Sequence, residues 1–245
     1  KAVCLNTEQQ CEVVESTLSQ LDTVTAKTHL SVLPFSVLLE NLLGVWANLW
    51  RGSIVYLRTS TELGISGAQG LDFHRFIATL NSTRPESMIL TPALTKALIH
   101  GVQLCPEIKQ KLSFIAVGGA PISSSLLIKA REMNIPIYEG YGLSEACSVV
   151  ALNRPNATQI GSVGKILPGR QLKIENEEIF VRGNLALGYL HGDEIEALTA
   201  KDEWFATGDI GELDEYGYLR VLGRKKELIV TPYGRNVSPA WVEGE

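Results

Sequence analysis

The sequence has few cysteines and histidines, and neither residue type recurs at the spacing of a metal site. The cysteines Cys4, Cys11, Cys105 and Cys147 form neither a paired metal knuckle nor a dense disulfide framework, so we expect free thiols in a cytoplasmic protein. Cys147 is interpreted as a small buried hydrophobe rather than a reactive thiol. The four histidines are scattered along the chain, which argues against a histidine metal centre.

The sequence also lacks an excess of positive charge and an uninterrupted hydrophobic run. Its net charge of -5 argues against a nucleic-acid binder, because phosphate backbones favour a basic face. Residues 30–57 are interrupted by polar residues before about 20 apolar residues accumulate, so we expect no transmembrane segment. Within them, apolar residues from Leu38 to Leu49 recur at helical spacing and predict a helix buried against a sheet, with a peripheral membrane face as the less favoured alternative. We expect no secretory signal, because mixed polar and apolar residues follow Lys1.

The composition is that of a globular protein, with 45% hydrophobic and 20% charged residues in 245. Over residues 1–152, short β-branched runs alternate with longer helical patterns, which predicts parallel strands joined by crossover helices. We expect an α/β fold with a doubly wound, mostly parallel sheet and helices on both faces. The predicted strands are 53–57, 87–90, 113–117 and 135–139, and the predicted helices are 72–80, 92–100 and 123–133.

The pattern changes after Asn153, where short alternating strands lie between glycines. Strands at 171–175, 178–182, 210–213 and 218–222 predict a small antiparallel, β-barrel-like subdomain over residues 153–223, with a hairpin turn at 214–217. Residues 224–245 start with a basic cluster and are expected to form a hinge and the start of a truncated C-terminal lid domain.

The strongest chemical signal is the run from Ile135 to Glu145, in which a buried strand leads into a glycine turn that ends in a hydroxyl and a carboxylate. Ligands of open α/β sheets bind outside the carboxyl ends of strands. Tyr141 offers a stacking face, Ser144 offers a hydroxyl to a phosphate oxygen, and Glu145 offers an oxygen ligand to magnesium. Taken alone, the motif fits a surface turn equally well.

Two further segments carry residues that suit a nucleotide. Residues 114–121 contain two glycines before a helix that begins near Ser123, where a backbone could approach an adenine, although a ligand-free turn is the better reading of this segment alone. Asp209 follows a glycine at the head of the strand 210–213, where its carboxylate could accept hydrogen bonds from ribose hydroxyls. The basic residues 224–226 are either a solvated face or a hinge that touches the nucleotide.

The motifs VGGAP, YEGYGLSE, GSVGKILPG, EIFVRG, WFATGD and LGRKKE follow one another in this order. With them the whole chain resembles the adenylate-forming superfamily of acyl-CoA synthetases, luciferases and peptide-synthetase adenylation domains. The resemblance implies ATP-dependent activation of a carboxylic acid, fatty or other, to an acyl-adenylate, followed by transfer to coenzyme A. The alternatives are a carrier-protein thiol as acceptor, or a non-catalytic nucleotide-binding module. A dinucleotide-binding oxidoreductase is disfavoured, because the glycines of residues 64–70 lack the required spacing.

The resemblance also implies roles for single residues. Ser144, where the family more often has threonine, Glu145 as the magnesium ligand and Lys226 as the pivot of the lid are the expected catalytic residues. The ATP or AMP site is expected to contain Gly118, Gly119, Ala120, Pro121, Glu139, Gly140, Tyr141, Gly142, Ser144, Asp209 and Arg224. Lys1 corresponds to the end of the family's phosphate loop. Because that loop and the lid lysine are not in the sequence, the piece by itself is expected to be inactive. Residues 33–37 also lack the histidine that many members place near the acyl group.

Overall fold

The computed structural model describes residues 2–66, 70–199, 203–227, 229–230 and 236–237. Its centre is a seven-stranded sheet in the order β3-β2-β4-β5-β6-β7-β8. The first five of these strands run parallel, and β7 and β8 are antiparallel additions at one edge. The strands are β2 (Thr28–Ser31), β3 (Ile54–Leu57), β4 (Ser87–Leu90), β5 (Phe114–Val117), β6 (Ile137–Leu143), β7 (Ser148–Leu152) and β8 (Lys165–Ile166). The predicted α/β class with a mostly parallel sheet is therefore confirmed.

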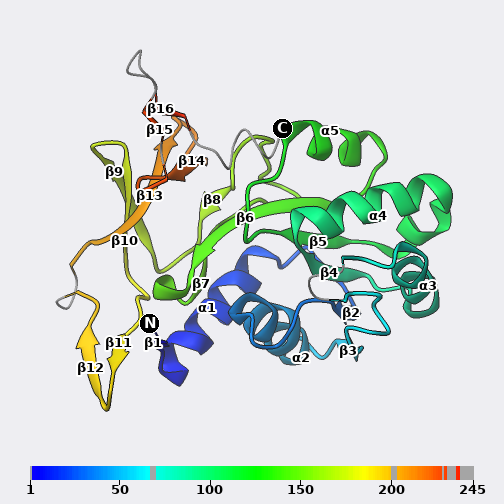
Figure 1. Cartoon of the computed structure of the whole chain (residues 1–245), viewed down its shortest axis with the longest axis horizontal. Coiled ribbons are helices and arrows are strands. Elements are labelled where there is room, and N and C mark those ends of the chain that lie inside the picture. Colours follow the sequence, from blue (N-terminus) through cyan, green and yellow to red (C-terminus); the bar gives the residue numbers. More distant parts are fainter. Residues whose placement is uncertain (1, 67–69, 200–202, 228, 231–235, 238–245) are drawn as a thin grey trace.

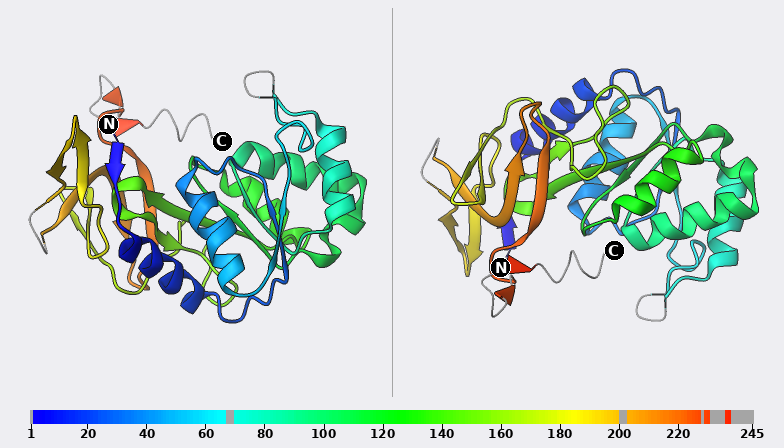
Figure 2. Two further views of the ribbon diagram at one scale, coloured as in Figure 1. Left: turned by 90° about the horizontal axis from the view of Figure 1, so that it is seen from below. Right: turned by 90° about the horizontal axis from the view of Figure 1, so that it is seen from above.

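Helices cover both faces of this sheet (Figure 1). The helices α3 (Phe73–Thr83), α4 (Pro92–Leu104) and α5 (Ser124–Glu132) lie on one face, and α1 (Thr7–Gln20), the π-helix η1 (Glu40–Trp46) and α2 (Ala47–Trp50) lie on the other, as the two views of Figure 2 show. Successive side chains of β5 point to opposite faces of the sheet. Ile115 packs with the core under α3 and α4, whereas Phe114 packs with Leu39 and Leu43 on the other face.

Side chains before the helices fix where they begin. Asn6 accepts a hydrogen bond from the backbone N–H of Gln9, whose side chain bonds back to Asn6, so α1 begins with a capping box. Thr91 caps α4, whose first residue is a proline, and Ser123 caps α5 as the sequence predicts. The short 3-10 helix η3 (Pro106–Lys111) connects α4 to β5.

Antiparallel strands make up the remainder of the described chain. A four-stranded sheet has the order β14-β13-β10-β9, and a three-stranded sheet has the order β1-β11-β12. The predicted hairpin turn is present, because the Asp214 N–H donates to the Tyr218 carbonyl at 3.1 Å. The strands are β1 (Ala2–Cys4), β9 (Gln171–Glu175), β10 (Glu178–Arg182), β11 (Gly188–His191), β12 (Glu194–Ala197), β13 (Phe205–Leu213), β14 (Leu219–Arg224), β15 (Ile229–Val230) and β16 (Asn236–Val237).

Two strands extend further than predicted, so motif residues that were expected before or after a strand lie within one. The strand β6 continues through Gly140 and Gly142 because β7 pairs with it antiparallel. A Cβ atom on Gly142 would lie 1.7 Å from the Ser148 carbonyl oxygen, so only glycine allows this pairing. Asp209 lies in the middle of β13 rather than before its first residue, because β13 already pairs with β10 from Phe205 onward.

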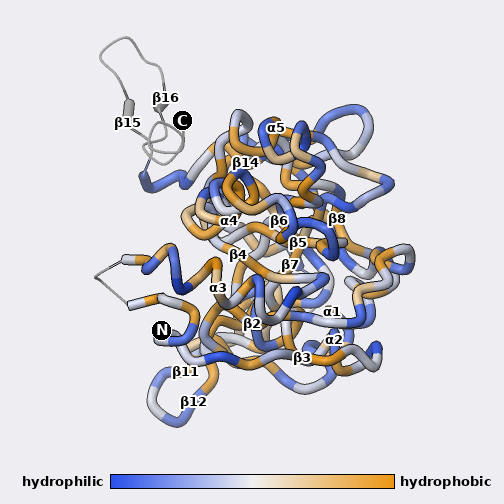
Figure 3. The backbone as a smooth tube through the Cα atoms, turned by 90° about the vertical axis from the view of Figure 1, so that its right-hand side faces the viewer, coloured by the Kyte–Doolittle hydropathy of each residue, from blue (hydrophilic) through white to orange (hydrophobic). Residues whose placement is uncertain are grey.

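The predicted helix over Leu38–Leu49 is present, but its burial is only partial. Leu42 is fully buried, whereas Trp46 and Leu49 are 41% and 57% exposed. Hydrophobic segments gather along the central strands and hydrophilic ones along the loops and the β11–β12 hairpin (Figure 3). None of the helices in the described ranges is long and apolar enough to cross a membrane. All four cysteines are free thiols, as predicted.

Candidate nucleotide and acyl site

Two cavities meet at the carboxyl end of β6. A polar cavity of about 400 Å³ and an apolar cavity of about 460 Å³ share four lining residues, which are Gly119, Gly140, Tyr141 and Gly142. Gly119 has φ +84°, a conformation that glycine adopts without strain. The shared backbone forms the boundary between a compartment suited to a polar ligand and one suited to an apolar ligand.

The polar cavity is bounded on one side by the main sheet and on the other by β13 and β14. Its residues come from the loop between β5 and α5, from the end of β6 and from the antiparallel sheet. Besides the shared residues, they are Ala120, Pro121, Ile122, Ser123, Ser124, Glu139, Gly161, Ser162, Val163, Asp209, Arg220, Val221, Leu222, Gly223, Arg224 and Glu227.

Asp209 is the most connected carboxylate of this cavity. The Tyr141 hydroxyl donates to its Oδ2 at 2.5 Å, and the Arg224 Nε lies 2.9 Å from its Oδ1. Burial raises the pKa of Asp209, whereas the Tyr141 hydrogen bond and the charge of Arg224 act in the opposite direction. The pKa of Tyr141 is raised by burial and by Asp209, so its hydroxyl stays protonated and acts as the donor.

Glu139 lies one residue before the shared glycines and lines the polar cavity. Its backbone carbonyl accepts hydrogen bonds from the N–H and the side-chain amide of Asn153. Burial raises the pKa of its carboxyl group to about 8. The group is therefore largely uncharged at neutral pH and can donate a hydrogen bond into the cavity.

Ser144 and Glu145 form the short 3-10 turn η4 (Ser144–Ala146) directly after β6. Ser144 lines the apolar cavity, and Glu145 lines neither cavity. The Tyr189 hydroxyl donates to Glu145 Oε1 at 2.7 Å, and the charge of Glu145 contributes to the raised pKa of Asp209. Burial and the neighbouring Glu145 raise the pKa of Tyr189 to about 12.

A metal ion at this site would need ligands from outside the described protein residues. No group of three or more histidine, cysteine, aspartate or glutamate side chains that could hold a metal occurs in the described ranges. Magnesium usually keeps several waters and binds one or two carboxylates together with substrate phosphates. The single carboxylate of Glu145 fits a magnesium ion that takes its other ligands from phosphates and waters. One carboxylate is too few for a metal that is held by protein side chains alone.

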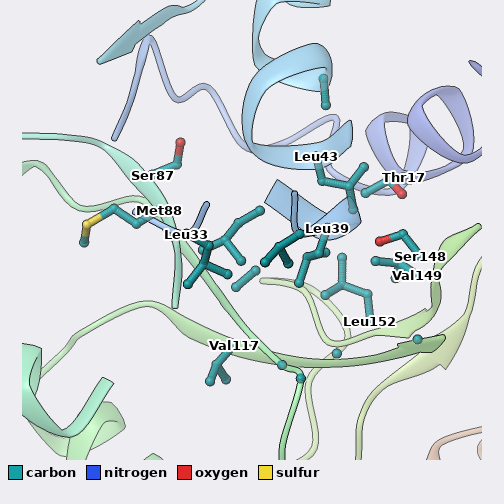
Figure 4. Close-up of a pocket in the computed structure, with 18 of the residues that line it drawn as sticks. Thr17, Leu33, Leu39, Leu43, Ser87, Met88, Val117, Ser148, Val149 and Leu152 are labelled. Carbon is teal, nitrogen blue, oxygen red and sulfur yellow. The ribbon is translucent and has the colours of Figure 1, made fainter. Parts of the chain in front are cut away.

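The apolar cavity lies between the sheet and the helical layer of α1 and η1 (Figure 4). Leucine and valine side chains from both layers converge on it, with Leu33, Leu39, Leu43, Val149 and Leu152 among those labelled. Polar residues also line it, among them Thr17, whose buried hydroxyl has no hydrogen-bond partner within the described residues, and Arg51, whose guanidinium donates to the Leu21 carbonyl. The cavity therefore suits the uncharged tail of a ligand whose polar end lies at the shared glycines.

Three buried polar side chains, those of His29, Ser87 and Glu40, form a hydrogen-bonded cluster beside the apolar cavity. His29 and Ser87 line it, and the His29 Nδ1 lies 2.9 Å from the Ser87 hydroxyl. The other ring nitrogen lies 3.4 Å from Glu40 Oε1, and the Glu40 side chain is fully buried in η1. The contact between His29 and Glu40 joins β2 to the π-helix η1.

The structure brings most of the predicted site residues together. Those that line one or both cavities are Gly118, Gly119, Ala120, Pro121, Glu139, Gly140, Tyr141, Gly142, Ser144, Asp209 and Arg224. Lys226 is exposed and lines neither cavity, although Arg224 and Glu227 on either side of it do. Lys1 lies outside the described residues.

Sequence reasoning missed several residues of the site. Gly161, Ser162 and Val163 line the polar cavity, and the GSVG motif was a signal for them, but no role was assigned to it. Tyr189 has no comparable signal, because it reaches Glu145 from a separate sheet.

The parallel sheet, the helix-covered faces and a polar cavity at the carboxyl ends of its strands define an open α/β protein whose candidate site lies where such folds bind their ligands. The model of the family described as AMP-binding enzyme matches residues 1–190. The chain belongs to this adenylate-forming family, whose curated members include acid–CoA ligases.

Relatives and solved structures agree with this assignment. The chain is 45% identical over 130 residues to the long-chain-fatty-acid–CoA ligase FadD15 of Mycobacterium bovis, covering 52% of this chain and 22% of the relative. It is 32% identical over 188 residues to the 2-succinylbenzoate–CoA ligase of Bacillus pumilus, covering 71% and 38%. The o-succinylbenzoate CoA synthetase of Bacillus subtilis, solved with its acyl-adenylate intermediate, superimposes with a TM-score of 0.81 at 26% identity, over 100% of this chain and 50% of that one. The same enzyme has been solved with ATP and a magnesium ion. The chain thus spans half or less of each of these proteins.

Proposed function

We propose that this chain supplies the adenylation site of an enzyme that uses ATP to activate a carboxylic acid and passes the acyl group to coenzyme A. The observation that carries the proposal is the junction of the polar and apolar cavities at Gly140–Gly142. An acyl-adenylate has a polar nucleoside, adenosine, and an acyl group on opposite sides of one phosphate. In this proposal residues 224–245, with Lys226 as pivot, form the hinge and the start of the lid, and the enzyme is cytoplasmic.

In this proposal AMP occupies the polar cavity. Asp209 accepts hydrogen bonds from the ribose hydroxyls, since a carboxylate offers about four acceptor positions and its two protein donors leave some of them available. Tyr141 provides an aromatic face for adenine at the end of β6. Arg224 is held beside Asp209 and supplies positive charge towards the ribose and phosphate.

The reaction is an in-line attack by a substrate carboxylate oxygen on the α-phosphorus of ATP. A phosphorus–oxygen bond to the carboxylate forms, and the bond to pyrophosphate breaks. The Ser144 hydroxyl would donate to a phosphate oxygen, and Glu145 would hold magnesium, which would neutralise phosphate charge. The thiol of coenzyme A then loses its proton to solvent and its sulfur attacks the acyl carbon, and AMP leaves with the electron pair of the broken carbon–oxygen bond.

The apolar cavity favours an acid with a hydrophobic tail over one with a second charged group. Leucine is the commonest residue of its lining, and Arg51 is the one arginine or lysine among the described residues that line it. A second carboxylate that does not reach Arg51 would be buried unpaired, at a cost of several kcal/mol. The similarity to a long-chain-fatty-acid–CoA ligase supports the same choice. We therefore propose a fatty or other apolar acyl acid as the substrate class.

Pyrophosphate release across a panel of carboxylic acids, with and without coenzyme A, tests this function. We expect release that depends on an apolar acid and acyl transfer that requires coenzyme A. Transfer to a carrier-protein thiol without coenzyme A would overturn the proposed acceptor. AMP binding with no pyrophosphate release for any acid, in a protein that includes the phosphate loop and lid, would instead favour a non-catalytic nucleotide-binding module.

A further inference from the structure

Tyr189 and Glu145 come from different sheets and meet through their side chains. Tyr189 lies on β11 of the three-stranded sheet, and Glu145 lies in the turn after β6 of the main sheet. The Tyr189 hydroxyl donates to Glu145 Oε1 at 2.7 Å across 44 residues of sequence. A hydrogen bond to a charged acceptor at this distance is among the stronger ones in proteins.

The backbone around both residues is fixed by the same segment. The Ala186 N–H donates to the Glu145 carbonyl at 2.7 Å, and the Leu187 N–H donates to the Cys4 carbonyl at 2.9 Å. In the next register positions Gly188 pairs with Cys4 and Tyr189 with Val3, so β1 lies beside β11 (Figure 1). The chain from Ala186 to Tyr189 therefore ties the η4 turn to the strand at the start of the described chain.

The contact engages only one oxygen of the Glu145 carboxylate. Within the described residues, no hydrogen bond reaches the second oxygen, Oε2. A carboxylate held through one oxygen has a fixed rotamer and keeps the other oxygen available to a cation. Groups that orient a metal ligand in this way raise metal affinity without touching the metal.

We propose that Tyr189 is a positioning residue that orients Glu145 to bind the magnesium ion of Mg-ATP. The inference rests on the proposed function, in which Glu145 is the magnesium carboxylate. It assigns the β11–β12 hairpin a role in nucleotide binding, although neither of its strands lines the polar or the apolar cavity.

The Tyr189→Phe variant tests the inference, because it removes the hydroxyl and keeps the ring. Titration calorimetry with a non-hydrolysable ATP analogue and magnesium, and manganese binding by electron paramagnetic resonance, measure metal affinity without turnover. We expect metal affinity to fall about tenfold. AMP affinity measured without metal and the thermal midpoint stay near those of the unmodified chain. Tyr216→Phe is the matched control, because Tyr216 is 66% exposed in a hairpin turn.

A double-mutant cycle separates positioning from general stability. In a Glu145→Gln background, Tyr189→Phe should cause no further loss of metal affinity, because the carboxylate it orients is gone. If the unmodified chain binds the ATP analogue with magnesium and Tyr189→Phe binds it equally well, the inference is wrong and the proposed function stands. If Glu145→Gln leaves metal affinity unchanged, the metal role of Glu145 in the proposed function fails first.

Discussion

The Tyr141 hydroxyl lies 2.5 Å from Asp209 Oδ2, and this contact joins the two sheets that bound the polar cavity. Tyr141 comes from the end of β6, whereas Asp209 comes from the middle of β13, 68 residues later. The contact fixes the proposed adenine side of the cavity relative to the proposed ribose side. It also makes the cavity sensitive to single changes at either residue.

Replacing Asp209 with alanine should weaken AMP and ATP binding by about ten- to hundredfold, because hydrogen bonds to a charged acceptor contribute roughly 1.5–3 kcal/mol. The KM for ATP should rise accordingly in the enzyme. Calorimetry on the chain measures the affinity, with Lys173→Met on β9, which does not line the polar cavity, as the control. An unchanged affinity would remove Asp209 from the ribose role.

Glu139 should make the stability of the protein depend on pH. Burial raises its pKa to about 8 from about 4.3 in an unfolded chain, so its stabilising contribution is complete below about pH 4 and is lost as pH rises through about 8. We expect Glu139→Gln to gain about 4 kcal/mol of unfolding free energy at most relative to the unmodified chain between about pH 5 and pH 9. Urea unfolding at several pH values measures this, with the exposed Glu15→Gln as the control. Parallel pH profiles for Glu139→Gln and the unmodified chain would contradict it.

Gly142→Ala should destabilise the protein by about 3 kcal/mol or more, because the new methyl group would overlap the backbone of β7. The Cβ position is 1.7 Å from the Ser148 carbonyl oxygen and 2.9 Å from the Val149 Cα. Gly52→Ala meets no atom within 4 Å, and its cost of about 1 kcal/mol comes from its positive φ alone. Denaturant unfolding compares the two, and equal losses would mean that the β6–β7 contact tolerates a side chain.

Ala116→Leu should shift the preference of the enzyme towards acids with shorter chains. Ala116 lines the apolar cavity from β5, and a leucine there would fill part of its volume. We expect the KM for long-chain acids to rise about tenfold, with short acids and AMP binding unaffected, since displacing one methylene from an apolar pocket costs about 1–3 kcal/mol. Equal changes in KM for long and short acids would mean that the acyl tail does not bind in the apolar cavity.

The sequence predicted the parallel layer well because local patterns determine it. The strands β4 and β5 and the helices α4 and α5 coincide with β-branched runs and capped helical patterns, within a few residues at their ends. The ends of β6 and β13 were wrong because pairing with β7 and β10 extends them, and a motif rich in glycine reads locally as a turn. The strand β7 was missed because all five of its residues are buried and show no alternation, and β11 was missed because its partner β1 lies near the start of the sequence.

The candidate site could be predicted only in part. Tyr141, Asp209 and Arg224 were recognised from motif order, and the structure brings them to one cavity. The contact between Tyr141 and Asp209 could not be read from the sequence, because it depends on how the two sheets pack. Their nucleotide roles and the metal role of Glu145 stay predictions.

Binding of a stable acyl-adenylate analogue to the chain tests the central claim most directly. If the two cavities form one site that meets at Gly140–Gly142, calorimetry should give one molecule bound per chain, more tightly than AMP alone. Asp209→Ala and Ala116→Leu should each weaken that single binding event. An analogue that binds no better than AMP, or that is insensitive to Ala116→Leu, would contradict the account.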